Sequence, residues 1–128
     1  MSTPDPKKVI EYLKAREEKV RQKKIQERKQ IVKKLKDLKP LWKSLNIERV
    51  YLYGSIARLN FHNESDIDVA IEGDINFKEL LNLINTVGDH FKREIDIRLI
   101  NELDFKEKIL REGIIIYERE NPDIEKRD

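Results

Sequence analysis

Three aspartates on short apolar segments are the residues of this sequence best suited to do chemistry. Asp66 and Asp68 are separated by one residue at the entry to an apolar run, and Asp96 lies within the later run 95–100. Residues two apart on a strand point to the same face, so Asp66 and Asp68 can aim two carboxylates at one spot. Mg²⁺ prefers oxygen ligands, and two such ions can hold both reacting oxygens of a phosphoryl transfer. The three aspartates therefore predict a divalent metal site.

A Gly-Ser pair stands ten residues before the first of these aspartates. Gly54 and Ser55 close the apolar run that ends at Tyr53, and Arg58 follows them. Glycine lets the backbone approach a phosphate closely, and we expect Ser55 to cap a short helix over residues 55–59 whose free N–H groups bind an anion. Arg58 would add a permanent, fork-shaped phosphate ligand. The pair therefore predicts a phosphate-binding turn beside the metal site.

Each of these features also has an ordinary structural explanation. Gly-Ser is common turn chemistry, and Ser55 can be a helix cap and nothing more. Asp68 can be a solvated residue on the polar face of a strand, and Asp96 can pair with Arg98 two residues later. The set is hard to explain jointly in this way, because a helix-opening turn, a fixed gap and three carboxylates on strands all point to one chemistry. We therefore interpret the set as functional.

Together these motifs resemble the signature of the minimal nucleotidyltransferases, small members of the DNA polymerase beta-like superfamily. The direct matches are Gly54, Ser55, Ala57, Arg58, Ser65, Asp66, Ile67 and Asp68, and Asp96 matches the third carboxylate. Leu59 departs from the pattern, which often has glycine after the arginine. This departure bears on the conformation of the loop and not on the metal ligands. The resemblance covers roughly residues 31–118.

The resemblance implies an α/β fold, and the periodicity of the chain agrees with it. We expect a mixed sheet of three or four strands with helices mainly on one face, plus a long N-terminal helix. The implied reaction transfers a nucleoside monophosphate, AMP from ATP, to a hydroxyl acceptor with two Mg²⁺ ions. The implied metal and catalytic residues are Asp66, Asp68 and Asp96, with Asp96 also accepting the acceptor's proton, and the implied nucleotide ligands are Gly54, Ser55 and Arg58.

The resemblance also implies an acceptor and a partner. Minimal enzymes of this family often accompany a small helical HEPN protein, a ribonuclease-type toxin, and the implied role is that of an antitoxin that adenylylates a tyrosine of the toxin. Two alternatives stay open. One is an antitoxin that blocks its partner without catalysis, which the intact set of three aspartates argues against. The other is a nucleotidyltransferase that acts on a small hydroxylated molecule.

Composition bounds the setting of this chain. The 128 residues include no cysteine, which excludes disulfides and cysteine-based metal sites. No apolar stretch approaches the roughly 20 residues that span a bilayer, and the first residues lack the apolar region of a signal peptide. We therefore expect a cytoplasmic protein with no membrane partner.

The coarse reading of the chain gives three parts. They are a basic, mostly helical arm over residues 1–30, a nucleotidyltransferase domain over 31–118, and a charged, disordered tail over 119–128. The expected elements are a helix over 7–39 that ends near Pro40, strands over 49–53, 67–72, 94–100 and 114–117, a helix from Phe77 whose apolar pattern reaches Phe91, with Asn76 as its cap, and a helix over 101–111 that ends at Gly113.

Charge is divided unevenly between the two ends. Residues 1–50 hold 16 Lys and Arg against 7 Asp and Glu, whereas residues 51–128 hold 11 against 18. A basic arm on an acidic body is typical of an interaction segment. We expect the arm to mediate assembly with a second copy or with the partner protein. Nucleic acid is the weaker candidate, because Tyr12 is the arm's one aromatic residue and base stacking needs such side chains.

Overall fold

The computed structural model describes residues 3–120, so most of the predicted tail, residues 121–128, lies outside the described part. The strands are β1 (Ile47–Tyr53), β2 (Ile67–Gly73), β3 (Ile95–Leu99) and β4 (Ile114–Glu118). The helices are α1 (Pro6–Asp37), α2 (Lys39–Ser44), α3 (Gly54–Ala57), α4 (Phe77–Gly88) and α5 (Lys106–Glu112), with a 3-10 turn, η1 (Ile100–Glu102). The four predicted strands are therefore all present.

The strands form one mixed sheet in the order β3-β2-β1-β4. β1 pairs antiparallel with both β2 and β4, and β2 pairs parallel with β3. A parallel pair needs a crossover connection, and α4 supplies it between β2 and β3. The expected mixed sheet of three or four strands is confirmed.

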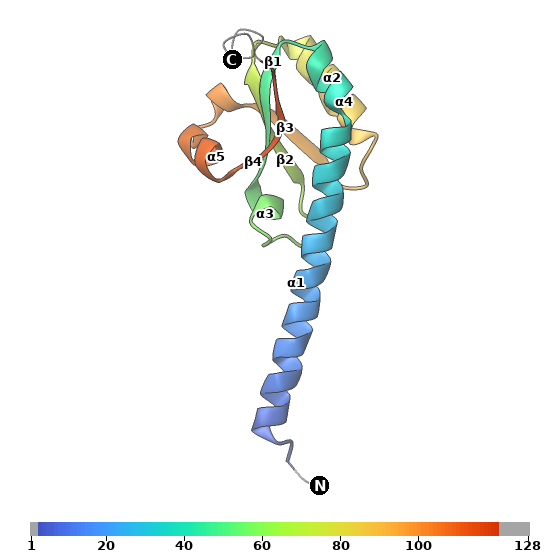
Figure 1. The fold of residues 1–128 in the computed structure, drawn as a ribbon, viewed down its shortest axis with the longest axis vertical. Helices are drawn as coiled ribbons and strands as arrows, with labels where there is room; N and C mark the ends of the chain where they lie inside the picture. Colours follow the sequence, from blue (N-terminus) through green and yellow to red (C-terminus); the bar gives the residue numbers. More distant parts are fainter. Residues whose placement is uncertain (1–2, 121–128) are drawn as a thin grey trace, which may run out of the picture.

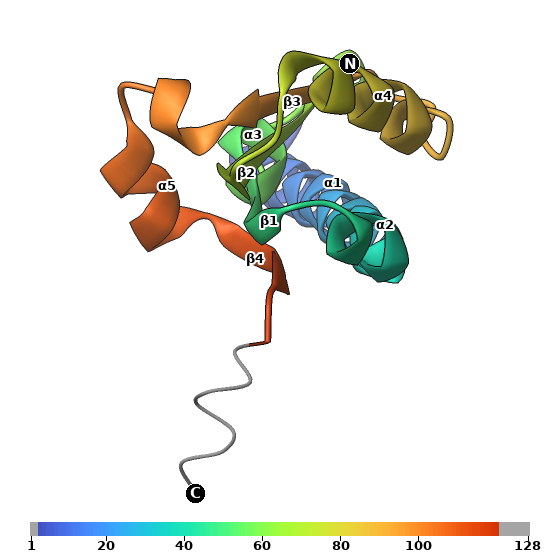
Figure 2. The same ribbon diagram turned by 90° about the horizontal axis from the view of Figure 1, so that it is seen from above.

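One face of the sheet carries the main hydrophobic core. Helices α1, α2 and α4 cover this face, as Figure 2 shows from above. The fully buried side chains there include Leu35 and Trp42 from the helices and Leu52 and Val69 from the strands. The indole Nε1 of Trp42 donates to the carbonyl of Leu35 at 2.8 Å, which satisfies the one polar atom of this side chain.

The opposite face is covered over part of its length only. A smaller cluster of Tyr51, Ala70, Ile100, Leu103 and Ile109 packs η1 and α5 against it, and Figure 2 shows α5 on the side of the sheet away from α1. The expected single helix over residues 101–111 is wrong, because the chain leaves η1 at Leu103 and restarts as α5 at residue 106. Leu103, at this break, is buried in the small cluster.

Helix α4 begins and ends with clear local chemistry. The side chain of Asn76 accepts from the backbone N–H of Glu79 at 2.8 Å, and the Glu79 carboxylate accepts from the backbone N–H of Asn76 at 3.0 Å. This reciprocal pair is a capping box, so the predicted cap is confirmed. The helix ends at Gly88, before Phe91, which lies beyond it although it follows the helical spacing.

Helix α1 divides into a part that packs and a part that projects. Its last two turns bury Ile31 and Leu35, whereas every residue from 6 to 23 is exposed. Figure 1 shows this first stretch of α1 extending away from the rest of the molecule. Residues 6–23 are therefore the projecting part of the arm that the sequence predicted over residues 1–30. Within residues 3–120, no helix has the length and apolar character needed to cross a membrane.

Candidate active site

Gly54 brings the backbone at the end of β1 directly alongside Asp68. Its φ is +78°, in the region that favours glycine. A Cβ atom at this position would overlap Oδ2 of Asp68 and lie 3.1 Å from its Cγ. Tyr53, the residue before, is the register partner of Asp68 across the β1–β2 pair. The glycine is therefore required for the close approach of the turn to this carboxylate.

Asp68 and Asp96 are direct neighbours across the parallel strands. They are register partners in the β2–β3 pair. The residues that follow them, Val69 and Ile97, point into the main core on the other face. Burial, followed by the nearby charges of Asp96 and then Asp66, raises the pKa of Asp68 to about 6 against the opposing effect of Arg98. Two of the predicted metal ligands therefore share the open face of the sheet.

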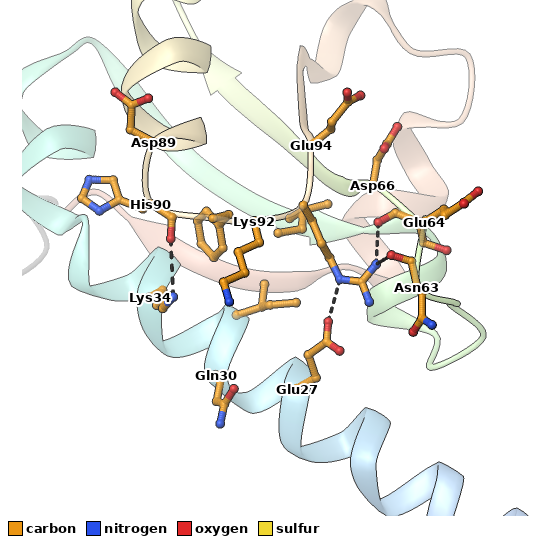
Figure 3. A pocket seen from close by; sticks show the side chains of 15 residues that line it. Glu27, Gln30, Lys34, Asn63, Glu64, Asp66, Asp89, His90, Lys92 and Glu94 are labelled. Carbon is orange, nitrogen blue, oxygen red and sulfur yellow. Dashed lines mark hydrogen bonds and ion pairs between the residues drawn. The ribbon is translucent and has the colours of Figure 1, made fainter.

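Asp66 lies just before β2 and is exposed. Figure 3 shows its carboxylate turned away from α1, next to Glu94. The carboxylate of Asp96 accepts from Nε of Arg98 at 3.2 Å on each oxygen. This pair is the one that the sequence offered as the structural explanation of Asp96.

The donor set fits a divalent cation in kind. Asp68 and Asp96 lie on one face of adjacent strands, and Asp66 lies just before β2. Burial, and then the charges of Asp96 and Asp66, raise the pKa of Asp68, and a bound cation would relieve this cost of ionisation. Over residues 3–120, no three acidic or histidine side chains already lie close enough together to hold a metal ion. A cation bound through Asp96 would compete with the ion pair between Asp96 and Arg98.

Gly54 and Ser55 are the first two residues of helix α3, so Ser55 does not cap it. The N-cap position is Tyr53, no side chain caps the helix, and Ser55 lies inside it. The predicted cap is therefore wrong, and the hydroxyl of Ser55 is not committed to the helix start. Arg58 lies exposed at the C-terminal end of α3. Leu59 then takes φ of +61°, which explains why glycine often follows the arginine in the family pattern.

An aromatic pocket beside the turn was not predicted. A cavity of about 370 Å³ lies between α3 and α5, lined by Tyr53, Gly54, Arg58, Phe105 and Lys108 among others. The rings of Tyr53 and Phe105 are 5.9 Å apart and tilted by 52°. Burial, and then the charges of Asp68 and Asp96, raise the pKa of Tyr53 to about 12, so its hydroxyl stays protonated.

The sequence carries a signal for one aromatic residue of this pocket, Tyr53, and none for the other, Phe105. The alternation along β1 places Tyr53 on the same face as Tyr51, and that face could have been inferred to be the one that carries Asp68. Phe105 had no comparable signal, because it reaches the pocket only through the break between η1 and α5.

A second, larger groove opens on the other side of Asp66. It has a volume of about 930 Å³ and lies between α1, the loop before β2 and the loop before β3. Figure 3 shows Glu27 of α1 facing this loop region, which includes Asn63 and Glu64. Most of its lining residues are polar or charged, and Asp66 is one of them.

The family model for polymerase beta nucleotidyltransferases matches residues 30–122 of this chain. The chain belongs to this nucleotidyltransferase family. The match spans the Gly-Ser turn and all three aspartates, and it confirms the resemblance that the motifs indicated. The expected enzyme class, a nucleotidyltransferase, is confirmed with it.

Relatives agree with this assignment. A candidate protein adenylyltransferase from Methanocaldococcus jannaschii is 32% identical over 82 residues, which cover 56% of this chain and 79% of that protein. A solved toxin–antitoxin with AMP-PNP superposes with a TM-score of 0.53 at 18% identity, covering 76% of this chain and 77% of that one. A candidate nucleotidyltransferase from Sulfolobus solfataricus gives a TM-score of 0.51 at 22% identity, covering 75% and 87%. The expected nucleotidyltransferase fold is confirmed.

Proposed function

We propose that this protein transfers AMP from ATP to a hydroxyl acceptor, with pyrophosphate leaving. The observation that carries the proposal is the pairing of Asp68 with Asp96 on the open face of the sheet, with Gly54 alongside. Phosphoryl chemistry depends mainly on positioning and on compensating the charge that develops on the phosphate oxygens. The open face of the sheet at Asp68 and Asp96 offers both positioning and a place for charge compensation.

Each residue of the set has a distinct role in the proposal. Asp66, Asp68 and Asp96 would hold Mg²⁺, which supplies charge neutralisation when bound. The free backbone beside Gly54 and the uncommitted hydroxyl of Ser55 bind the β- and γ-phosphates. A carboxylate oxygen of Asp96 accepts the proton of the acceptor hydroxyl.

The aromatic pocket is the proposed site for the rest of the nucleotide. Phe105 offers an exposed ring face for a base, and Arg58 and Lys108 supply positive charge at the rim. Because Tyr53 stays protonated, its hydroxyl can donate to a phosphate or ribose oxygen. The site therefore has separate places for triphosphate and nucleoside.

The proposed acceptor is a tyrosine of a HEPN-type toxin, which makes this protein its antitoxin. Support comes from the Methanocaldococcus relative, which is named for adenylylating protein, and from the shared fold of a toxin–antitoxin solved with AMP-PNP. The Asp96–Arg98 ion pair favours the alternative of an antitoxin that binds without catalysis, because it occupies the third carboxylate.

Incubation with ATP labelled at the α-phosphate, Mg²⁺ and the candidate toxin tests these functions. We expect label on a toxin tyrosine with the wild type, and none with Asp68→Asn. Asp74→Asn is the matched control, because Asp74 is an exposed aspartate just beyond the other end of β2. Suppression of the toxin by the wild type and by Asp68→Asn alike, with no label transferred, would instead establish the non-catalytic antitoxin.

The arm is proposed to mediate assembly. Its projecting part, residues 6–23, is exposed throughout and basic. This part carries the exposed apolar side chains of Val9, Ile10, Tyr12, Leu13 and Val20. An isolated helix of this kind gains little from its own residues, so packing against an acidic surface of a partner or second copy would stabilise it. Light scattering on the chain with and without residues 1–23 tests this, and unchanged assembly after the deletion would refute it.

A further inference from the structure

Arg93 is the most highly connected charged side chain of the described residues outside the site. Its Nη1 donates to the carbonyl of His62 at 2.8 Å, of Asn63 at 3.2 Å and of Ser65 at 2.8 Å. Its Nε donates to the carboxylate of Glu27 on α1 at 2.6 Å. One guanidinium therefore joins three segments of the chain.

The surroundings of Arg93 hold it in place. Its guanidinium lies 5.1 Å from the centroid of the Phe61 ring, which is buried. The side chain of Arg93 is 14% exposed, whereas that of Glu27 is 41% exposed. A planar fork that is largely removed from water binds several acceptors at once, which the point charge of a lysine does not reproduce.

The carbonyls that Arg93 binds belong to the loop that leads into the site. Residues 60–66 connect the Gly-Ser segment to β2, and Ser65 immediately precedes Asp66. The loop closes on itself through the N–H of Ser65 to the carbonyl of His62 at 3.1 Å, and the N–H of His62 to Oγ of Ser65 at 3.0 Å. Arg93 thus anchors a compact turn whose next residue is a predicted metal ligand.

The same arginine also stands at the entry of β3. The residue after it, Glu94, accepts through its carbonyl from the N–H of Ile67 at 2.9 Å, at the start of the parallel pair. The starts of β2 and β3 are therefore joined at the residue next to Arg93, and these strands carry Asp68 and Asp96. On α1, the neighbour of Glu27 makes a related contact, since Nη1 of Arg28 donates to the carbonyl of Ala57 at the end of α3 at 2.7 Å.

We propose that Arg93, held by Glu27, is a positioning residue that fixes the loop over residues 60–66 and, through it, the carboxylate of Asp66. The inference rests on the proposed function for its kinetic consequence. Arg93 acts through the loop and does not reach the reacting atoms, since the loop and Glu27 lie on the groove side while Asp66 turns the other way (Figure 3). Helix α1 is thereby part of the scaffold of the site.

Two measurements on the full-length protein test the inference. The variants are Arg93→Lys, which keeps the charge but not the fork, and Glu27→Gln, which removes the ion pair and leaves the guanidinium. Lys92→Met is the matched control, because Lys92 is an exposed cation next to Arg93 in the loop before β3. The first readout is amide hydrogen exchange over residues 60–67 without nucleotide, and the second is AMP transfer as kcat and KM for ATP.

We expect Arg93→Lys to speed exchange over residues 60–67 roughly tenfold or more, while the amides of β1 and β4 keep their protection. We expect kcat to fall about 10- to 100-fold with KM for ATP within about threefold, because misplacing a ligand affects the reaction more than nucleotide binding. Glu27→Gln changes both readouts in the same direction by less.

Exchange over residues 60–67 that matches Lys92→Met would overturn the inference, whatever the activity. Local exchange that speeds up while kcat stays at the wild-type value would overturn it as well, since the loop would then be merely structural. A wild-type protein without any AMP transfer contradicts the proposed function alone, because the exchange measurement still decides whether Arg93 fixes the loop.

Discussion

The two faces of the sheet divide stability and chemistry between them. On the face covered by α1, α2 and α4, Leu52, Val69 and Ile97 are at most 3% exposed. On the opposite face, the residues next to them in the same strands are Tyr53, which lines the aromatic pocket, and the paired carboxylates Asp68 and Asp96. Because side chains alternate along each strand, a core residue and the site residue next to it point to opposite faces of the sheet.

The comparison shows that the reaction face is not optimised for stability. Its buried cluster is small, and Asp68 is held partly buried beside two other carboxylates, which favours its protonated form. The free-energy cost of holding these carboxylates together is offset by the packing on the other face. Substitutions in the site and in the core test this division, beginning with the one of largest expected effect.

Asp68→Asn should separate activity from stability most clearly. Loss of one central carboxylate is expected to lower AMP transfer by roughly 10³-fold, because several kcal/mol of charge compensation disappear. Stability without divalent metal should rise by about 1 kcal/mol at pH 7, a figure reduced for the solvent screening of a half-exposed group. Transfer assays and urea denaturation measure both effects.

The pH dependence gives the control for this prediction. The folded pKa of Asp68, about 6, lies above its ordinary value of 3.8, so the folded state binds this proton more tightly. The contribution of Asp68 to stability is therefore present below pH 4 and is lost as the pH rises to about 6. The difference between wild type and Asp68→Asn should grow across this window, and a constant difference would contradict the assignment.

Leu52→Ala should show the reverse pattern. Leu52 is fully buried in the main core, and removing its side chain is expected to lower the free energy of unfolding by about 3 kcal/mol. Activity per folded molecule should stay close to wild type, because Leu52 points away from the carboxylates. Ile115→Ala on the exposed edge of β4 is the control, with an expected change under about 0.5 kcal/mol. A large loss of kcat in folded Leu52→Ala would break the comparison.

Gly54→Ala should affect both properties, because this residue lies where the turn meets Asp68. Its positive φ and the overlap of a Cβ with that carboxylate are expected to cost about 1–3 kcal/mol of stability and to weaken ATP binding through the backbone. Ser55→Ala should instead weaken ATP binding with stability within about 0.5 kcal/mol of wild type. Thermal melting and titration with ATP and Mg²⁺ compare the two. Equal affinities in both variants and wild type would mean that the turn is only structural.

Substitutions of Leu59 should give the smallest effect, and they should reverse the usual order of stability between alanine and glycine variants. Leu59 holds a φ of +61° while its side chain packs against the main core. Leu59→Ala loses the packing and keeps the backbone strain, whereas Leu59→Gly loses the packing and relieves the strain. We therefore expect the glycine variant to be more stable than the alanine variant by about 1 kcal/mol, opposite to the usual order. Chemical denaturation of both variants decides, and a more stable alanine variant would contradict a strained loop.

Local chemistry made much of this protein predictable. The Gly-Ser turn, the spacing to Asp66 and Asp68, and the cap at Asn76 depend on neighbouring residues, so the sequence alone indicates them. The alternation in residues 49–53 and 67–72 likewise marks strands with one buried face. Family and fold class follow from these motifs, and both are confirmed.

Tertiary structure decided what depends on distant segments. The order β3-β2-β1-β4 sets Asp68 beside Asp96, and it arises from burying one continuous core rather than from any local signal. The break between η1 and α5 brings Phe105 to Tyr53, against the helical pattern of residues 101–111. Arg93 contacts residues about 30 and 66 positions away, and its role is invisible until packing closes those loops. Sequence thus determined which chemical groups are present, and packing determined which of them meet.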